Sequence, residues 1–344
     1  MRKLEKNKRL TYRSGTKTKG GAMTTMTKGK LTNLKKVANK KGIIACAAMD
    51  QRGSLQKSLA KVKGVDPKEI SKEQLAEFKM AVTKILSPYA SGILLDPEYG
   101  LEAAKARAKT CGLLLAYEKS GYDNVRPGRM PDLIENWSVQ KIKKAGGDAV
   151  KILLHYTPFE KKEINEQKQK WVEAIGKECV EADIPYFLEF VGYDPNGGDE
   201  KSLDYAKLKP EIVTKSMEEF SKDRYHVDVL KVEIPVNMEY VGKAYSKKEA
   251  IAHFQNAAKA TTKPFIYLSA GVADHVFRAS LELAIEAGVK FNGVLCGRAT
   301  WKDGIPVYAK SGATALEKWL SDRGVQNIQA LNAILEKGAT SIRF

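Results

Sequence analysis

One stretch of the sequence combines the pattern of a buried β-strand with three charged side chains. Residues 227–235, VDVLKVEIP, are mostly β-branched and aliphatic, as in a strand covered on both faces, yet they include Asp228, Lys231 and Glu233. Side chains alternate between the two faces of a strand, so Lys231 should share a face with Glu233. Burial disfavours an ammonium ion, and a neutral lysine amine in an enclosed site is a nucleophile toward carbonyl groups. A structural ion pair between Lys231 and a nearby carboxylate is the alternative.

Lys151 and Glu189, each in another apolar run, give Lys231 a chemical context. A lysine with the reference pKa of about 10.4 must lose roughly three pKa units, or about 4 kcal/mol, to be a nucleophile near neutral pH. Lys151 is predicted to be a second cation that lowers the pKa of Lys231 and to hydrogen-bond a substrate oxygen. Glu189, inside the run YFLEFV, is expected among the apolar side chains of Phe187, Leu188 and Phe190 and is the predicted general acid/base. This combination suits imine chemistry on a keto sugar, because a protonated imine accepts electrons when the neighbouring C–C bond breaks.

These residues belong to an alternation of short apolar runs and amphipathic stretches that begins at Gly42. Eight runs are predicted to be strands, over residues 43–50, 92–96, 113–118, 149–156, 186–193, 227–234, 265–270 and 292–297. Helices are predicted over residues 72–90, 164–183, 210–222, 275–288, 314–322 and 327–337, among others. The pattern predicts an α/β fold, a single (β/α)8 TIM barrel over residues 27–344 with extra C-terminal helices. A doubly wound open sheet is the competitor, although no GxGxxG follows the first strand.

Polar residues lie near the end of almost every predicted strand, where a barrel builds its active site. They are Asp50, Gln51 and Arg52 at the first strand, Asp96 and Glu98 at the second, Glu118 at the third, Lys151 in the fourth, Glu189 in the fifth, Ser269 after the seventh and Arg298 after the eighth. Any one of them could be a paired core charge. Unpaired burial of so many charges would cost several kcal/mol each, so together they indicate a polar pocket.

Two glycine-containing turns follow the seventh and eighth predicted strands. Ser269-Ala270-Gly271 and Gly297-Arg298 stand where barrels often bind phosphate through backbone N–H groups. Arg298 is able to add a bidentate contact. Either motif alone is common, and their position after these two strands is what predicts phosphate binding.

The formal net charge of +17 is concentrated at the N-terminus. Residues 1–42 contain fourteen Lys and Arg and one acid, Glu5, which leaves +4 for the rest of the chain. Residues 1–26 have almost nothing to bury and are predicted to be a disordered basic extension. Such an arm could bind nucleic acid, or it could be a solvated tail or the product of an upstream translation start. The near-neutral remainder argues against nucleic acid as a partner.

Several classes of protein are disfavoured by what the sequence lacks. No apolar run is long enough for a transmembrane helix and no apolar segment follows the basic start, so no membrane association and a cytoplasmic location are expected. The four cysteines and four histidines show no ligand spacing, so neither a metal nor another cofactor is expected. The cysteines are expected to be reduced and buried.

From about Gly42 to Lys337 the sequence resembles the tagatose 1,6-diphosphate aldolases, class I lyases of the bacterial tagatose 6-phosphate route. The resemblance rests on AMDQRG (48–53), ILLDPEYG (93–100), LLLAYEKSGYD (113–123), VLKVEIPVNMEYV (229–241), YLSAGV (267–272) and GVLCGRATW (293–301). It implies that Lys231 forms the imine, that Glu189 is the acid/base and that Lys151 assists. It also implies that Asp50 and Gln51, with Arg52 beside them, line the site, and that Ser269, Gly271, Gly297 and Arg298 contact phosphate.

The resemblance predicts reversible cleavage of D-tagatose 1,6-bisphosphate into dihydroxyacetone phosphate and D-glyceraldehyde 3-phosphate, without a cofactor. Two alternatives stay open. The substrate could be another ketose phosphate, such as fructose 1,6-bisphosphate or a sulfo-sugar phosphate, because epimers differ in few hydrogen bonds. The chain could instead be a non-catalytic sugar-phosphate sensor on the same scaffold. A homo-oligomer is possible on either reading.

Overall fold

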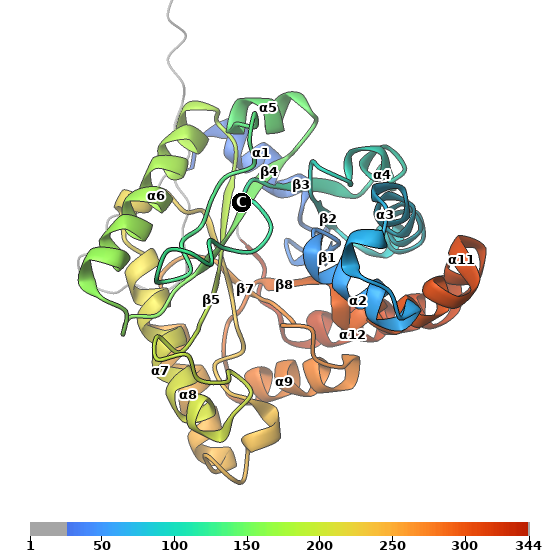
Figure 1. Ribbon diagram of the computed structural model, residues 1–344. Helices are drawn as coiled ribbons and strands as arrows, with labels where there is room; N and C mark the ends of the chain where they lie inside the picture. The colour runs from blue at the N-terminus through green and yellow to red at the C-terminus, as the bar shows by residue number, and fades with distance from the viewer. Residues whose placement is uncertain (1–25, 343–344) are drawn as a thin grey trace, which may run out of the picture.

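Within residues 26–342, which the computed structural model describes, eight parallel strands form a closed barrel (Figure 1). Each strand pairs with the next in the chain, and β8 pairs with β1. The strands are β1 (Ile44–Ala48), β2 (Gly92–Leu95), β3 (Gly112–Ala116), β4 (Ala149–His155), β5 (Tyr186–Val191), β6 (Val229–Val232), β7 (Phe265–Tyr267) and β8 (Gly293–Cys296). This confirms the predicted (β/α)8 barrel and each predicted strand.

Apolar residues cover both faces of these strands. On β6, Val229 belongs to the cluster inside the barrel, whereas Leu230 and Val232 belong to the larger cluster between the strands and the surrounding helices. Strand alternation places Lys231 on the same, inward face as Val229. The β5–β6 register sets Glu189 beside Lys231. Lys231 and Glu189 therefore both face the barrel interior, next to the apolar residues of the inner cluster.

The helices lie around the outside of the barrel (Figure 1). They are α2 (Gly53–Lys63), α3 (Lys72–Leu86), α4 (Leu101–Lys105), α5 (Val139–Lys144), α6 (Lys162–Glu181), α7 (Leu203–Phe220), α8 (Lys247–Lys259), α9 (Asp274–Glu286), α10 (Arg298–Trp301), α11 (Ile305–Trp319) and α12 (Val325–Gly338). Short 3₁₀ segments (Pro67–Glu69, Ser87–Tyr89, Asp223–Tyr225, Met238–Tyr240, Lys302–Gly304) and a π-helical turn (Leu320–Gly324) join them. The predicted C-terminal helices are α11 and α12.

Helix α7 begins earlier than predicted. The helix was predicted over residues 210–222, which begin with Pro210. The structure instead begins α7 at Leu203 and places Pro210 in its interior. Ser202 is the N-cap, and its side chain accepts a hydrogen bond from Tyr205 N. The N-cap residue Ser202, and not Pro210, therefore marks the start of α7.

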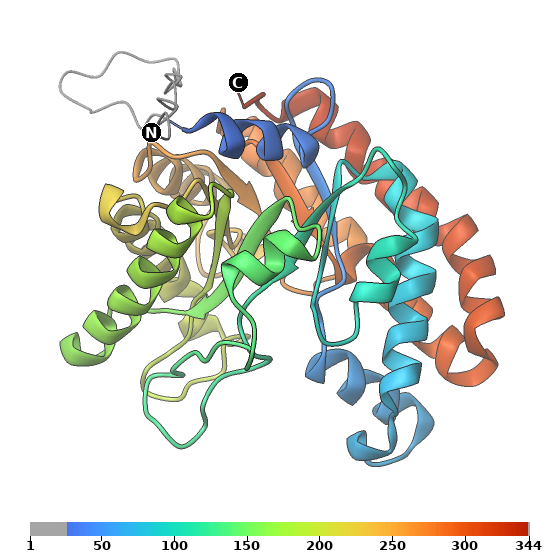
Figure 2. The same cartoon turned by 90° about the horizontal axis from the view of Figure 1, so that it is seen from above.

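The amino-terminal end of the barrel is closed by α1 (Lys28–Lys36), a helix that the sequence reading missed. Leu34 and Val37 are fully buried against the inner cluster. The C-terminal segment runs beside them, and Ile342 N donates to Gly42 O at 2.8 Å. Figure 2 shows α1 and the C-terminal segment together at this end, away from the long green loop that follows β3. Residues 1–25 of the predicted extension lie outside the described residues, whereas Met26 is buried with the inner cluster.

Candidate active site

A cavity of about 630 Å³ opens at the carboxyl ends of the strands. Its lining includes all ten residues predicted to form the site: Asp50, Gln51, Arg52, Lys151, Glu189, Lys231, Ser269, Gly271, Gly297 and Arg298. They come from the ends of β1, β4, β5, β6, β7 and β8, or from the loops directly after them. The structure thus brings the ten residues to one place, and their individual roles remain predictions.

Lys151, on β4, is surrounded by carboxylates. Its Nζ lies 2.8 Å from Asp50 Oδ2, 2.8 Å from Glu118 Oε1 and 2.8 Å from Glu189 Oε2. Burial alone would lower the pKa of Lys151, but these three carboxylates raise it well above its ordinary value. Lys151 therefore carries a positive charge throughout the neutral range and is poorly suited to be the nucleophile.

Glu189 bridges the two lysines. Lys231 Nζ lies 2.8 Å from Glu189 Oε2, which is the same oxygen that contacts Lys151 Nζ. One carboxylate oxygen therefore contacts both amines. Burial would raise the pKa of Glu189, but Lys151 and Lys231 outweigh it and lower that pKa. Glu189 is thus a carboxylate at neutral pH, which accepts protons.

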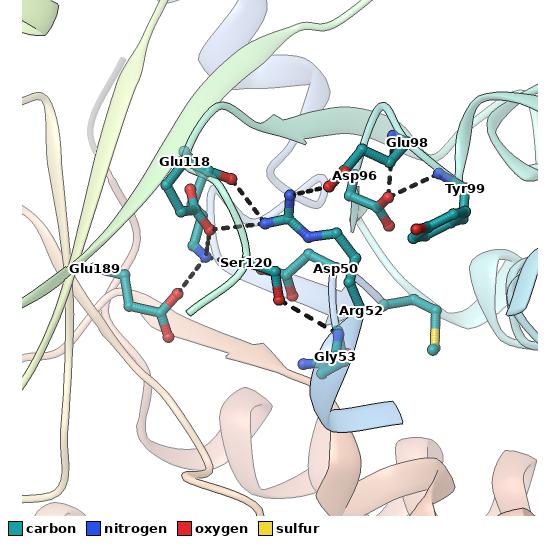
Figure 3. Close-up of polar contacts among 12 residues, drawn as sticks. Asp50, Arg52, Gly53, Asp96, Glu98, Tyr99, Glu118, Ser120 and Glu189 are labelled. Carbon is teal, nitrogen blue, oxygen red and sulfur yellow. Dashed lines mark hydrogen bonds and ion pairs between the residues drawn. The ribbon is translucent and has the colours of Figure 1, made fainter. Parts of the chain in front are cut away.

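The predicted apolar surroundings of Glu189 are present only in part, because Phe187 lies in the cluster inside the barrel but two other predicted neighbours do not. Its neighbours Leu188 and Phe190 belong to the cluster between the strands and the helices, on the opposite face of β5. The side chain of Glu189 itself points at the lysines, as Figure 3 shows for its contact in the centre of the site. Strand alternation separates residues that are adjacent in sequence, so neighbours at i±1 do not describe the environment of a side chain on a strand.

Asp50 and Glu118 share Lys151 but differ in their tendency to hold a proton. Burial would raise the pKa of Asp50, yet Lys151 and Lys231 lower it far below its ordinary value. For Glu118 burial prevails over the nearby Lys151 and Arg52, and its pKa is raised. Arg52 holds this side of the site in place, donating through Nη2 to Glu118 O at 2.7 Å and through Nη1 to Glu98 Oε2 at 2.5 Å (Figure 3).

Each of the three charges around β6 has a partner. Asp228 Oδ2 lies 2.7 Å from Lys30 Nζ at the amino end of the barrel. Lys231 meets Glu189, and Glu233 Oε1 lies 3.1 Å from Lys209 Nζ on α7. The ion pair considered as the alternative for Lys231 is therefore present, and both of its residues line the cavity.

The two turns predicted to bind phosphate pack against each other. Ala270 and Gly271 have left-handed backbone, with φ of 48° and 78°. A Cβ atom at Gly271 would lie 2.8 Å from the guanidinium carbon of Arg298, so glycine permits this close approach. Lys302 Nζ donates to Gly271 O at 3.1 Å. The turns therefore place backbone groups and one arginine at the same rim of the cavity.

Comparison with known proteins agrees with this geometry. A model of the DeoC/LacD family aldolases matches residues 44–303. This chain belongs to the DeoC/LacD aldolase family. Tagatose 1,6-diphosphate aldolase 2 of Enterococcus faecalis is 50% identical over 325 residues, which cover 93% of this chain and 97% of that protein. Tagatose 1,6-diphosphate aldolase of Staphylococcus aureus is 49% identical over 318 residues, which cover 91% and 97%.

A solved structure of fructose-bisphosphate aldolase from Plasmodium falciparum is similar in fold, with a TM-score of 0.66 and 12% sequence identity. The match covers 90% of this chain and 94% of that one. At this identity the likeness concerns the barrel alone. The relatives with about 50% sequence identity show that the chain is an aldolase, which is a lyase, with a phosphorylated sugar as its substrate.

The aldolase site contains residues that the sequence reading did not assign. Glu118 was noted only as a polar strand end, although it contacts Lys151 as closely as Asp50 does. His155 and Tyr122 also line the cavity, with their ring centroids 4.7 Å apart. Burial, together with Arg129 and Lys168, lowers the pKa of His155 to about 4, so this imidazole is neutral at pH 7. His155 ends β4, and that position was the signal that could have found it.

In residues 26–342 no three His, Cys, Asp or Glu side chains are grouped so as to hold a metal ion. The same part of the chain has no helix of the length and hydropathy needed to cross a membrane. Its cysteines, Cys46, Cys111, Cys179 and Cys296, are unbonded and buried, and burial raises the pKa of each thiol. They are therefore poor nucleophiles.

Proposed function

We propose that this aldolase cleaves D-tagatose 1,6-bisphosphate through an imine on Lys231. The observation that carries the proposal is the unequal pairing of the two buried lysines. Lys151 has three carboxylate partners at 2.8 Å and stays charged, whereas Lys231 forms an ion pair with one carboxylate, Glu189, and lines the cavity. The relatives named tagatose 1,6-diphosphate aldolase support this substrate over fructose 1,6-bisphosphate, a sulfo-sugar phosphate or a sensor role.

The first half of the reaction makes the imine. The amine of Lys231 attacks the C2 carbonyl of the open-chain ketose, and the resulting carbinolamine takes up a proton and loses water. Glu189, held ionised between two cations, accepts the proton released by the attacking amine. Glu118, whose pKa is raised, is the carboxyl better able to hold a proton for the departing hydroxyl. The site thus contains one carboxyl suited to each direction of proton transfer.

The second half breaks the carbon chain. A base removes the proton of the C4 hydroxyl, the C3–C4 bond breaks, and its electrons pass into the protonated imine to give an enamine. D-glyceraldehyde 3-phosphate leaves as the aldehyde. Protonation of the enamine at C3 and hydrolysis of the imine release dihydroxyacetone phosphate and restore Lys231. Lys151, held as an ammonium by three carboxylates, supplies a positive charge within the site during these steps.

A bisphosphate requires cationic groups at both ends of the cavity. Arg298, with the backbone of the turns at Ser269–Gly271 and Gly297, is the group proposed for one phosphate. Arg52, Lys57 and Lys119 line the cavity from α2 and from the loops after β1 and β3, and they offer positive charge for the other. Two basic regions on different loops fit a substrate with a phosphate at each end.

Borohydride trapping tests the mechanism. Incubation with dihydroxyacetone phosphate and sodium borohydride should attach the three-carbon unit to one lysine, and peptide mapping should find it on Lys231. Labelling of Lys151, or of neither lysine, would contradict the proposed nucleophile. Turnover of D-tagatose 1,6-bisphosphate, measured beside D-fructose 1,6-bisphosphate with a coupled triose-phosphate assay, tests the substrate.

We also infer a cytoplasmic location, because phosphorylated sugars are highly charged and are retained inside cells. Assembly into a homo-oligomer stays a prediction. Sedimentation of the full chain and fractionation of cells that express it would test these two inferences.

A further inference from the structure

Lys79 is a fully buried lysine outside the catalytic cavity. It lies on α3, in the outer layer, and none of its side chain is exposed. Its Nζ donates to Met49 O at 2.6 Å and to Gln51 O at 2.7 Å, and lies 2.7 Å from Asp96 Oδ2. Burial lowers its pKa despite the nearby carboxylate. A charge buried this completely needs all three partners.

The two carbonyl groups held by Lys79 flank Asp50. Met49 precedes Asp50 and Gln51 follows it, so the backbone on both sides of Asp50 is tied to one ammonium group on α3. The Asp50 side chain reaches the other way, to Lys151 at 2.8 Å. Lys79 thus holds the backbone on both sides of Asp50 and is not among the residues that line the cavity.

Asp96, the charged partner of Lys79, fixes a second loop of the site. Its Oδ1 accepts hydrogen bonds from Glu98 N at 3.1 Å and Tyr99 N at 2.8 Å, which shape the turn after β2 (Figure 3). Glu98 in turn contacts Arg52, which donates to Glu118 O. The Lys79–Asp96 pair is therefore connected to both carboxylates that contact Lys151 from this side of the site. It reaches Asp50 through the backbone, and it reaches Glu118 through Glu98 and Arg52.

We propose that the Lys79–Asp96 pair is a positioning pair for the aldolase reaction, which fixes Asp50 and so the ammonium of Lys151 beside Glu189 and Lys231. This inference rests on the proposed function. Misplacement of a catalytic group by about 1 Å can cost about 10²-fold in rate, so a distant ion pair of this kind can control turnover. A purely structural pair would affect the stability of the barrel and leave turnover by the folded enzyme unchanged.

The protein contains a matched pair with which to separate these roles. Lys30 and Asp228 are also buried, and their charged atoms also lie 2.7 Å apart, but they are at the amino end of the barrel. Asp228 Oδ2 accepts a hydrogen bond from Tyr186 N at 2.9 Å, so it too supports backbone. The two pairs thus have the same residue types and the same distance, both are buried, with 0% and 6% of their side chains exposed, and they differ in what they support.

The test compares Lys79→Met/Asp96→Asn with Lys30→Met/Asp228→Asn, which remove both charges of each pair at once. Single substitutions would leave an unpaired buried charge and could prevent folding. With each variant measured at a temperature where circular dichroism shows it folded, the first should lower kcat at least about tenfold. The second should leave kcat within about twofold. Equal and small effects on kcat would overturn the positioning role.

A second measurement uses Asp50→Asn as the background. If Lys79 and Asp96 act through Asp50, their replacement should cost little further activity once the Asp50 carboxylate has been removed. A full additional loss of kcat in that background would overturn the proposed route. Wild-type protein without turnover would overturn the proposed function and this inference together, whereas wild-type turnover with an unaffected Lys79→Met/Asp96→Asn variant would overturn only the inference.

Discussion

The two ends of the barrel use similar charged residues in different ways. At the amino end, Lys30 and Asp228 form an isolated pair beside an apolar plug that includes Leu34 and Val37. At the carboxyl end, Lys151 contacts three carboxylates, and one of them also contacts a second lysine. A one-to-one pair neutralises two charges and closes the fold. A shared carboxylate between two amines, open to a cavity, leaves groups that can exchange protons.

The carboxyl end also carries stability that depends on pH. Asp50 and Glu189 have pKa values lowered by the lysines beside them, despite burial. A carboxyl with a lower pKa in the folded state stabilises the protein above its unfolded pKa of about 4, and this stability is lost as pH falls through the folded value. The carboxyl end of the barrel therefore combines the proposed active-site cavity with stability that is lost in acid.

The largest expected effect comes from Lys231→Ala. This change removes the proposed nucleophile, so cleavage of the bisphosphate and borohydride labelling by dihydroxyacetone phosphate should both disappear. Lys30→Ala, at the other end, should leave labelling intact in the folded protein while lowering the free energy of unfolding by about 3–5 kcal/mol, because Asp228 loses its partner. Persistence of the label on Lys151 in Lys231→Ala would reverse the assignment of the two lysines.

Glu189→Gln is expected to have the next largest effect. It removes the base but keeps the side-chain shape, so the imine should form more slowly and still be trapped by borohydride on longer treatment, while turnover falls by about 10² to 10⁴. Single-turnover kinetics would separate the two steps. Asp228→Asn provides the matched change at the amino end and should leave both steps unaffected in the folded enzyme. Loss of trapping together with loss of turnover would mean that Glu189 is needed to form the imine as well.

Lys151→Met should slow turnover and shift its pH dependence. Lys151 helps to lower the pKa of Glu189, so its removal should raise that pKa. Glu189 would then become protonated at a higher pH, and the acid limb of the kcat profile should move upward in pH. An unshifted acid limb in an active variant would show that another group controls it.

The strands and the site lysines could be predicted because they depend on local pattern. Eight apolar runs marked the strands, and a charge within such a run, as at Lys151 or Lys231, stood out against them. Parallel strands in a barrel end at one rim, so topology alone brought the ten site residues together. The misreading of Glu189 came from adjacent residues, Leu188 and Phe190, which lie on the other face of the strand.

Other features depend on partners far away in the sequence. Lys30 was counted only among the basic residues of positions 1–42, and its role in α1 appears only with Asp228, 198 residues later. Lys79 looked like one lysine of an amphipathic helix. A signal was present, since Lys79 follows Leu75 by four residues and so lies on the apolar face of α3. A lysine on such a face predicts a buried partner, but the sequence does not say that the partner is the backbone around Asp50.

The smallest effects on turnover should come from substitutions at two glycines with positive φ, one at each end of the barrel. Gly271 has φ of 78°, and an added Cβ would meet the flexible guanidinium of Arg298 at 2.8 Å. Gly293 has φ of 133°, and an added Cβ would meet the backbone oxygen of Ile44 at 1.9 Å. Gly271→Ala should therefore displace Arg298 and raise KM severalfold, with a strain cost of about 1–2 kcal/mol.

Gly293→Ala should affect stability and leave substrate binding unchanged, because the β8–β1 backbone at the amino end must move while the cavity keeps its lining. Its free energy of unfolding should fall by more than that of Gly271→Ala, and its KM in the folded state should stay near the wild-type value. Inhibition by inorganic phosphate offers a direct measure, since it should weaken in Gly271→Ala and be unchanged in Gly293→Ala. Equal phosphate inhibition in the two variants would remove the turn at Gly271 from the proposed phosphate site, and with it one of the features that distinguish the carboxyl end.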